Sequence, residues 1–314
     1  MNETNTPIHA PVLLQESVQA LNIKADGVYV DGTFGRGGHS RAILHSLGEG
    51  RLYAFDRDPE AVAEAKQIEA CNFHIIHAPF SDMQSELARV GVTQVDGVLL
   101  DLGVSSPQLD QAERGFSFMR DGPLDMRMDS TRGQSAAQWL ALADEQEIRE
   151  VLENYAEERN ARLIARAIVT TRQSAPLTRT HALAALVAET VRTRERGQHP
   201  ATRTFQAIRI HVNRELAELD TVLPQALNLL APRGRLAVIS FHSLEDRLVK
   251  RFMQAQCAPE QLLSRELMRL GVQSERVATM RKVGKDLVAG ADELLRNPRA
   301  RSARLRVAEK RESL

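Results

Sequence analysis

Short apolar or β-branched runs, each followed by glycine or acidic residues, recur along the chain and predict buried strands. They cover residues 27–30, 51–55, 73–77, 95–100 and 235–240. Helical spacing of apolar residues lies between the first four runs, including residues 40–47 and 59–69. At the start of the second segment, Asp58 suits a helix cap and Pro59 suits the first helical turn. This alternation of strands and helices predicts a doubly wound parallel sheet.

The fourth and fifth runs are separated by about 130 residues, far more than the dozen or so that a crossover requires. Apolar residues spaced by three and four predict that this insertion is mostly helical, with helices over residues 136–155, 159–171, 180–192 and 204–223. Residues 114–133 are rich in Gly, Asp and Arg and predict an irregular loop. After the fifth run we expect a helix over residues 244–256 and a late antiparallel edge strand over residues 302–307.

The predicted fold class is therefore α/β, with a Rossmann-like doubly wound sheet and an inserted, mostly helical second domain. We place the sheet domain at residues 1–108 and 216–314 and the insertion at residues 109–215.

A glycine-rich segment joins the first predicted strand to the first helix, with glycines at positions 32, 35, 37 and 38 after Asp31. Dinucleotide-binding proteins have the order G-x-G-x-x-G here, with a pyrophosphate at the helix N-terminus. This chain has G-x-x-G-x-G instead. An acidic residue before the loop would repel a pyrophosphate and attract a ligand with a positively charged amino acid portion. S-adenosylmethionine fits this pattern, whereas NAD fits poorly.

The following strands also end in residues that suit a nucleoside ligand. Asp56 lies about 20 residues after the loop, where a carboxylate can bind two ribose hydroxyls. Asp58 competes for this role, but its place before Pro59 is better explained as a helix cap. Phe80 follows the third strand and offers a ring beside an adenine, and Asp101 ends the fourth. Because ligands of open sheets bind at the carboxyl ends of strands, these residues predict one cofactor site.

The chain has two cysteines, Cys71 and Cys257, and neither follows a predicted strand. Methyl transfer to cytosine C5 requires a thiolate that attacks the ring, so this reaction is disfavoured. Transfer to nitrogen or oxygen requires only alignment and a hydrogen-bond acceptor for the proton of the acceptor atom. Asp101 is the catalytic candidate for this acceptor, and a role in orienting the cofactor alone fits it equally well.

The inserted domain is strongly basic although the whole chain is neutral, with 41 basic and 41 acidic residues. Residues 159–214 contain eleven arginines and two acidic residues. Arginine binds phosphates with two hydrogen bonds and stacks on unpaired bases, so the insertion is predicted to bind structured RNA. The alternative is that some arginines pair with residues 144–158, which contain seven acidic residues and one arginine.

The chain has neither a secretory signal nor an apolar run of the roughly 18 residues that span a bilayer. Two cysteines without paired spacing also exclude a disulfide framework or a thiolate zinc site. We therefore expect a cytoplasmic enzyme without a bound metal. The sequence leaves its oligomeric state open, a homodimer included.

Several segments together closely resemble the bacterial ribosomal RNA small subunit methyltransferase H family, from about residue 8 to residue 306. They are HAPVLL (9–14), DGTFGRGGHS (31–40), DLGVSSPQ (101–108), RGFSF (114–118), PLDMRM (123–128), HPATRTF (199–205) and ISFHSLEDR (239–247). The resemblance implies an enzyme that uses S-adenosyl-L-methionine to methylate N4 of a cytidine in the decoding region of 16S ribosomal RNA. It also implies cofactor contacts at Gly37, Gly38, His39, Asp56, Phe80, Asp101 and Gln108.

One feature departs from many amino-group methyltransferases, which have a D-P-P-Y type loop whose carbonyl and ring hold a flipped base. Here the loop after Asp101 has neither the double proline nor the aromatic residue. Phe116, Phe118 and Trp139 are candidates to stack the base instead, although a lone tryptophan is more often part of a core. Three histidines in the motifs above are weaker candidates for substrate contact, namely His9, His199 and His242.

Two other functions compete with methyl transfer. A dehydrogenase is disfavoured by the order of the glycines. An RNA-binding ribosome assembly factor with a vestigial cofactor fold is disfavoured because Asp31, the glycine loop, Asp56 and Asp101 are intact.

Replacing Arg192, Arg194 and Arg196 together with alanine should weaken RNA binding and flatten its salt dependence, because each phosphate contact adds to the number of counterions released. Binding of ribosomal RNA, measured over a range of salt concentrations, checks this. An unchanged slope of log K against log salt would contradict the assignment.

Overall fold

The computed structural model describes residues 11–191, 199–262 and 277–312. His9, Arg192, Arg194 and Arg196 lie outside the described residues. The chain forms two compact units: the first is Met1–Gly103 with Leu216–Leu314, and the second is Val104–Glu215. The second unit therefore interrupts the first in sequence.

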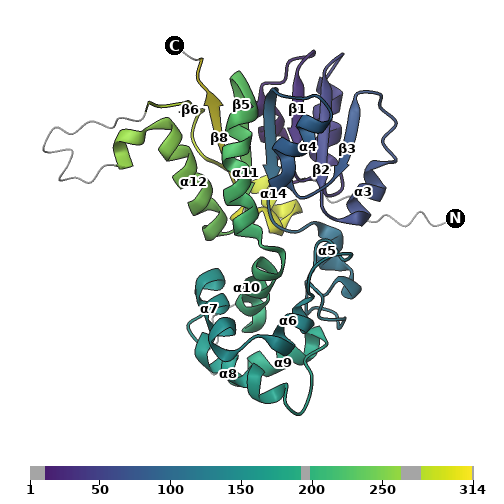
Figure 1. Ribbon diagram of the computed structural model, residues 1–314, viewed down its shortest axis with the longest axis vertical. Coiled ribbons are helices and arrows are strands. Elements are labelled where there is room, and N and C mark those ends of the chain that lie inside the picture. The colour runs from purple at the N-terminus through teal and green to yellow at the C-terminus, as the bar shows by residue number, and fades with distance from the viewer. Residues whose placement is uncertain (1–10, 192–198, 263–276, 313–314) are drawn as a thin grey trace, which may run out of the picture. The chain divides into compact units, whose positions relative to one another are not determined.

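The first unit is built on one sheet with the strand order β3-β2-β1-β4-β5-β8-β6, and β7 pairs with β8 beside this path (Figure 1). Its strands are β1 (Val28–Asp31), β2 (Arg51–Asp56), β3 (Phe73–His77), β4 (Val95–Asp101), β5 (Leu230–Ser240), β6 (Met280–Lys282), β7 (Leu287–Val288) and β8 (Arg304–Lys310). Strands β1 to β5 pair in parallel. All five apolar runs are therefore strands, and the predicted α/β class is confirmed.

Successive residues of the strands enter two different cores, one on each face of the sheet. Val30 and Val98 belong to a core with residues of the helices α4 (Met83–Arg89), α11 (Glu215–Leu229) and α12 (Ser243–Cys257). Tyr29 and Leu99 belong to a core with residues of α1 (Leu14–Leu21) and α2 (Gly38–Ser46), against which Leu294 of α14 (Ala291–Arg296) also packs. Helices thus cover both faces, as a doubly wound sheet requires.

The last strand, β8, corrects one prediction. It pairs antiparallel with β5, as expected, but it is not an edge strand. The short strands β6 and β7 pair with its other side, at Met280–Lys282 and Leu287–Val288. Two and three residues are too few to show the alternation by which a strand is predicted, so neither was found from the sequence.

The second unit is helical and has its own core. Its helices are α5 (Ser106–Asp110), α6 (Ala136–Leu142), α7 (Glu145–Ala156), α8 (Ala161–Thr171), α9 (Thr180–Thr190) and α10 (Ala201–Asn213). Ile148, Ile164, Leu183 and Ile208 are fully buried in one cluster from four of these helices. The predicted helical character is confirmed.

Two helices that were predicted as continuous are interrupted. The segment over residues 136–155 is divided into α6 and α7, because the Asp144 side chain accepts a hydrogen bond from the Glu147 backbone and caps a new helix. The segment over residues 204–223 is divided at Arg214, whose φ of 53° is left-handed and ends α10 before α11 begins. Apolar periodicity continues across both breaks, so it did not reveal them.

Asn213, the last residue of α10, anchors the irregular loop of the second unit. Its side chain accepts a hydrogen bond from Met128 N (2.7 Å) and donates to Met126 O (2.7 Å). Asn213 is only 3% exposed, so these bonds satisfy backbone groups away from water. These hydrogen bonds thereby fix the backbone conformation of a loop that is rich in Gly, Asp and Arg.

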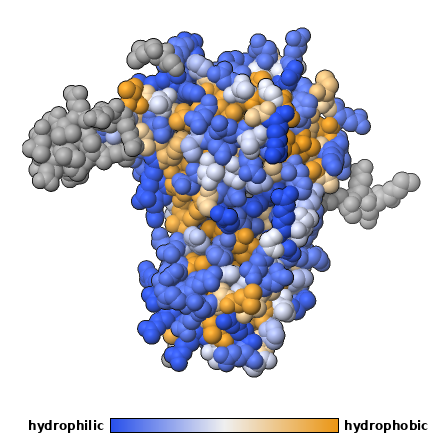
Figure 2. Space-filling model, in the orientation of Figure 1, coloured by the Kyte–Doolittle hydropathy of each residue, from blue (hydrophilic) through white to orange (hydrophobic). Residues whose placement is uncertain are grey.

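Figure 2 shows hydrophilic residues over much of the visible surface, with hydrophobic patches between them. Within residues 11–191, 199–262 and 277–312, no helix has the length and apolar character that crossing a membrane requires.

Replacing Asn213 with alanine should lower the free energy of unfolding by about 2 to 4 kcal/mol, because it leaves the buried Met128 N–H and Met126 carbonyl without this partner. Urea denaturation of the full chain measures the change. Asn154→Ala is a matched control, because Asn154 is exposed on α7 of the same unit. Equal stability of the two variants would contradict the anchoring role.

Candidate functional site

Three aspartates end neighbouring parallel strands of the first unit. Asp31, Asp56 and Asp101 are the last residues of β1, β2 and β4. β1 pairs in parallel with both β2 and β4, so the three carboxyl ends lie at the same edge of the sheet. Parallel sheets bind ligands at this edge.

Asp31 is fully buried and is held by the segment that follows it. Its Oδ2 accepts a hydrogen bond from the Ser40 hydroxyl of α2 (2.6 Å), and its Oδ1 accepts one from Thr33 N (3.1 Å). Burial raises the pKa of Asp31, while the His39 charge and the hydrogen bonds from Ser40 and Thr33 oppose that rise. The carboxylate therefore connects the end of β1 to the start of α2.

The glycine loop needs its glycines for backbone geometry and for close packing. Gly35 and Gly37 have φ of 56° and 72°, in the region that glycine adopts freely. A Cβ on Gly37 would lie 2.5 Å from the Phe34 ring, and one on Gly38 would lie 2.0 Å from Cγ of Pro11. Either substitution would force the loop to move.

Asp56 binds two backbone N–H groups, one on each carboxylate oxygen. Gly35 N donates to Oδ2 (2.7 Å) and Asp58 N donates to Oδ1 (2.8 Å). Burial raises the pKa of Asp56 to about 6 against these hydrogen bonds, and the charges of Asp58 and Asp31 add to the rise. The Asp58 side chain accepts from Glu60 N at the start of α3 (Pro59–Ala65), so its predicted role as a helix cap is confirmed.

Asp101 is held by contacts of its backbone N and of one carboxylate oxygen. Its backbone N donates to the Thr33 hydroxyl (2.6 Å), and its Oδ2 lies 3.5 Å from Nδ1 of His39. Its Oδ1 is buried and has no hydrogen-bond partner among the described residues. Burial raises the pKa of Asp101 to about 6; the His39 charge opposes this, and those of Asp31 and Glu245 add to it.

His39 is the second residue of α2, and its ring is buried at 5% exposure. Nε2 lies 3.2 Å from the carbonyl oxygen of Val12, and Nδ1 faces Asp101. The ring therefore contacts a main-chain acceptor and a carboxylate at once. Neither contact was predicted, because a backbone carbonyl such as that of Val12 leaves no signal in a sequence.

The two remaining predicted cofactor residues lie in different units. Phe80 opens a short 3₁₀ helix three residues after β3 and is partly buried. Gln108 belongs to the second unit, where it is 5% exposed and accepts a hydrogen bond from Ser105 N (3.0 Å) at the start of α5. The geometry thus brings Asp31, Asp56, Asp101 and His39 together within the first unit.

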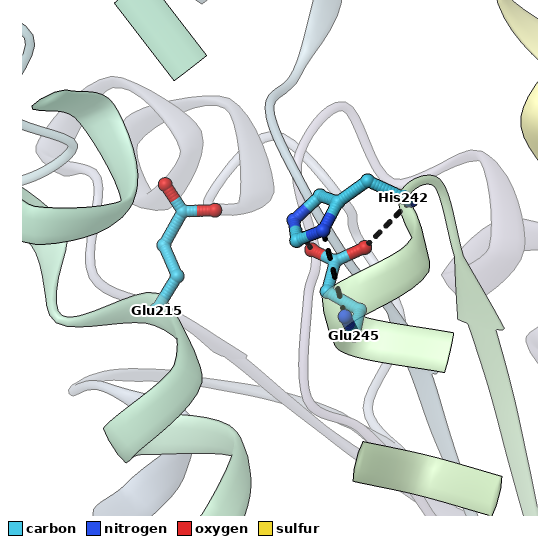
Figure 3. A group of neighbouring side chains, drawn as sticks. All are labelled: Glu215, His242 and Glu245. Carbon is cyan, nitrogen blue, oxygen red and sulfur yellow. Dashed lines mark hydrogen bonds and ion pairs between the residues drawn. The ribbon is translucent and has the colours of Figure 1, made fainter. Parts of the chain in front are cut away.

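His242 and Glu245 form a pair at the start of α12 (Figure 3). Nε2 of His242 lies 3.1 Å from Glu245 Oε1, and Glu245 Oε2 accepts from Phe241 N (2.9 Å). This pairing explains His242 as part of a helix cap. Glu215, also drawn, belongs to the second unit, where it accepts two hydrogen bonds from Arg209.

The aromatic candidates for stacking a base differ in exposure. Phe116 and Trp139 are 6% and 5% exposed, and the Trp139 indole donates to Glu147 Oε1 (2.8 Å). Phe118 is only partly buried and packs against His199, with ring centroids 4.7 Å apart. Trp139 therefore packs as a core residue.

Part of the arginine excess in the second unit is structural. Arg172 donates to the carbonyls of Leu140 and Ala143, and Arg179 pairs with Asp121. By contrast, three arginines at and before the exposed face of α8 form no ion pair with the described residues, namely Arg159, Arg162 and Arg166.

The chain is similar in sequence to known methyltransferases. The family model described as the MraW methylase family matches residues 6–311. A curated relative from Chromobacterium violaceum, named ribosomal RNA small subunit methyltransferase H, is 58% identical over 310 residues. The match covers 98% of this chain and 96% of the relative.

Solved structures are similar only at low identity. An rRNA methylase from Streptococcus thermophilus is 11% identical with a TM-score of 0.41, and the match covers 99% of this chain and 100% of that one. A 1,6-didemethyltoxoflavin-N1-methyltransferase from Burkholderia thailandensis, solved with S-adenosylhomocysteine, is 12% identical with a TM-score of 0.39, over 95% and 78% of the two chains. Both TM-scores lie below 0.5, so these similarities say nothing further about this chain.

The raised pKa of Asp101 predicts a pH dependence of stability. Between about pH 4, where an unfolded aspartate titrates, and about pH 6, the folded Asp101 keeps a proton that the unfolded chain has released. Its contribution to stability therefore falls as the pH rises through this window. Asp101→Asn should gain stability relative to the wild type from pH 4 to pH 7, by up to about 3 kcal/mol.

Thermal and urea unfolding without ligand at each pH measure this difference. The exposed Asp26 provides a control, because Asp26→Asn should show no such trend. A constant difference between Asp101→Asn and the wild type over this range would contradict the raised pKa.

Proposed function

The chain belongs to the MraW methylase family, and from this premise we propose that it transfers a methyl group from S-adenosylmethionine to a base of small-subunit ribosomal RNA. The resemblance to the methyltransferase H family in the sequence is thereby confirmed. The observation that carries the proposal is the set of aspartates at the ends of β1, β2 and β4, with the buried Oδ1 of Asp101, which has no hydrogen-bond partner among the described residues.

The residues at this edge fit S-adenosylmethionine by charge and by shape. The donor carries a sulfonium and an ammonium group, and the carboxylates of Asp31, Asp56 and Asp101 offer compensating charge. Burial raises the pKa of Asp56 and of Asp101, and the charge of Asp31 adds to both rises, so a cation beside these carboxylates stabilises their ionised forms. The glycine loop allows a close approach of the backbone at the same strand end.

We assign the cofactor contacts to the seven positions that the family resemblance implies, Gly37, Gly38, His39, Asp56, Phe80, Asp101 and Gln108. Each oxygen of Asp56 accepts one backbone N–H and retains a lone pair for a ribose hydroxyl. Phe80 is partly buried beyond the end of β3, where a ring can cover an adenine. When bound, S-adenosylmethionine supplies an activated methyl group.

An amino nitrogen suits this site better than a ring carbon as the methyl acceptor. Attack on C5 requires a cysteine, but Cys71 is exposed before β3 and Cys257 ends α12. Asp101 provides instead a carboxylate at the end of β4 whose side chain is 24% exposed. The family resemblance names the acceptor as N4 of a cytidine in the decoding region of 16S ribosomal RNA, and these observations support it.

We assign RNA binding to the second unit. Its exposed arginines at positions 159, 162 and 166 are suited to phosphates because they form no ion pair with the described residues. The relative is named a ribosomal RNA small subunit methyltransferase, and we propose the small ribosomal subunit, or its precursor, as the particle that carries this RNA. Such a substrate would place the reaction in the cytoplasm.

Transfer of labelled methyl to small-subunit particles that lack the modification tests the function. We expect N4-methylcytidine among the nucleosides after digestion and mass spectrometry. Protein that binds the particles and S-adenosylmethionine but transfers no methyl would instead favour an assembly factor with a vestigial cofactor fold.

Asp56→Ala should raise the Kd for S-adenosylmethionine at least tenfold, because hydrogen bonds to a charged group contribute about 1.5 to 3 kcal/mol each. Calorimetric titration measures this. Asp58→Ala is the matched control: it removes the α3 cap and lowers stability by about 1 kcal/mol, but it should leave this Kd nearly unchanged. A larger effect on Kd in the control would reverse the two assignments.

A further inference from the structure

The cofactor contact assigned to His39 falls to its backbone, because its buried side chain has other partners. Its ring is 5% exposed, with Nε2 at 3.2 Å from the Val12 carbonyl and Nδ1 at 3.5 Å from Asp101 Oδ2. A carbonyl oxygen only accepts hydrogen bonds, so Nε2 carries a hydrogen. The partner of Nδ1 then determines the state of the ring.

With Nε2 protonated, Nδ1 faces Asp101 either as a second N–H or as a lone pair. A lone pair against an ionised carboxylate is repulsive, so the contact is favourable only when a proton lies on one of the two groups. His39 and Asp101 therefore share one proton more than a neutral imidazole and an ionised carboxylate would hold.

The other contacts of Asp101 point in the same direction. Its backbone N is bound to Thr33 Oγ1 (2.6 Å), which fixes the end of β4, and Oδ2 faces His39. Oδ1 is buried without a partner among the described residues. The side chain is 24% exposed, so a carboxylate held in this way offers its accessible part in a defined orientation.

Resting on the proposed function, we propose that His39 is the positioning residue of Asp101. It holds Oδ2, and thereby fixes the orientation of the carboxylate that accepts the proton of the substrate amino group. In the transfer, the amino nitrogen forms a bond to the methyl carbon, and the sulfur–carbon bond breaks with its electron pair remaining on sulfur. The nitrogen then loses one N–H proton to the Asp101 carboxylate, and the products are the methylated amine and the neutral thioether.

The charges around the pair predict how removal of His39 acts. Asp31 of β1 and Glu245 of α12 favour protonation of Asp101, and His39 of α2 opposes them. Without the imidazole, Asp101 stays protonated to a higher pH and cannot accept a proton there. The loss of rate should therefore be largest near neutral pH and should be recovered as the pH rises.

The test compares His39→Gln with the wild type in single-turnover transfer from pH 5.5 to 9, together with calorimetric binding of S-adenosylmethionine. We expect a Kd within about threefold of the wild type and a rate at neutral pH lower by about 10- to 100-fold. The rise of the rate with pH should be displaced to higher pH. His45→Gln is the control, since His45 is exposed on the same helix and should change none of these.

A Kd that rises as much as the rate falls would make the His39 side chain a cofactor ligand and overturn the proposal. If the rate of His39→Gln rose with pH over the same range as that of the wild type, the proposal would also be overturned, because that outcome indicates a structural role alone. If wild-type protein transfers no methyl at any pH, the proposed function fails first and this inference falls with it.

Asp101→Asn keeps the test decisive even if His39→Gln does not fold. It should lose the rate at every pH without recovery at pH 9, and adding His39→Gln to it should slow the reaction no further. Wild-type rates in Asp101→Asn, or independent losses in the double variant, would overturn the proposal.

Discussion

The arrangement of the site depends on the hydrogen bonds of the fully buried Asp31 carboxylate. A carboxylate removed from water is costly unless hydrogen bonds replace its hydration, and Ser40 and Thr33 supply them here. Thr33 in turn accepts the backbone N–H of Asp101. One buried charge thereby connects the end of β1, the start of α2 and the end of β4. These hydrogen bonds constrain the conformation of the glycine loop between β1 and α2.

This arrangement concentrates negative charge at one edge of the sheet. Asp56 and Asp101 each have a pKa raised to about 6, and the charge of Asp31 contributes to both shifts. Burial is the largest cause of the raised pKa of Asp31 and Asp101, and the charge of His39 opposes it at both residues. A cationic methyl donor suits such a site, because it stabilises the ionised carboxylates that the fold alone disfavours.

The strands and their acidic ends were predictable, because apolar runs followed by Asp31, Asp56 and Asp101 leave a direct pattern in the sequence. The breaks at Asp144 and Arg214 were not, because a local cap and one left-handed residue interrupt helices whose apolar spacing continues. The neighbours of β8 were not predicted, because β6 and β7 are too short to show the alternation of apolar and polar residues that marks a strand. The role of the His39 ring escaped for another reason: its partners are a backbone carbonyl and a residue 62 positions away, and only the fold brings them together.

The central claim is that the carboxylates at the ends of β2 and β4 are partly protonated near pH 6 and are ionised by the bound cation. Calorimetric titration of S-adenosylmethionine at pH 6, in two buffers with different ionisation enthalpies, measures the protons exchanged on binding. We expect net proton release at pH 6 that diminishes by pH 7.5, and a smaller release at pH 6 in Asp101→Asn. Binding at pH 6 without proton release would contradict the claim.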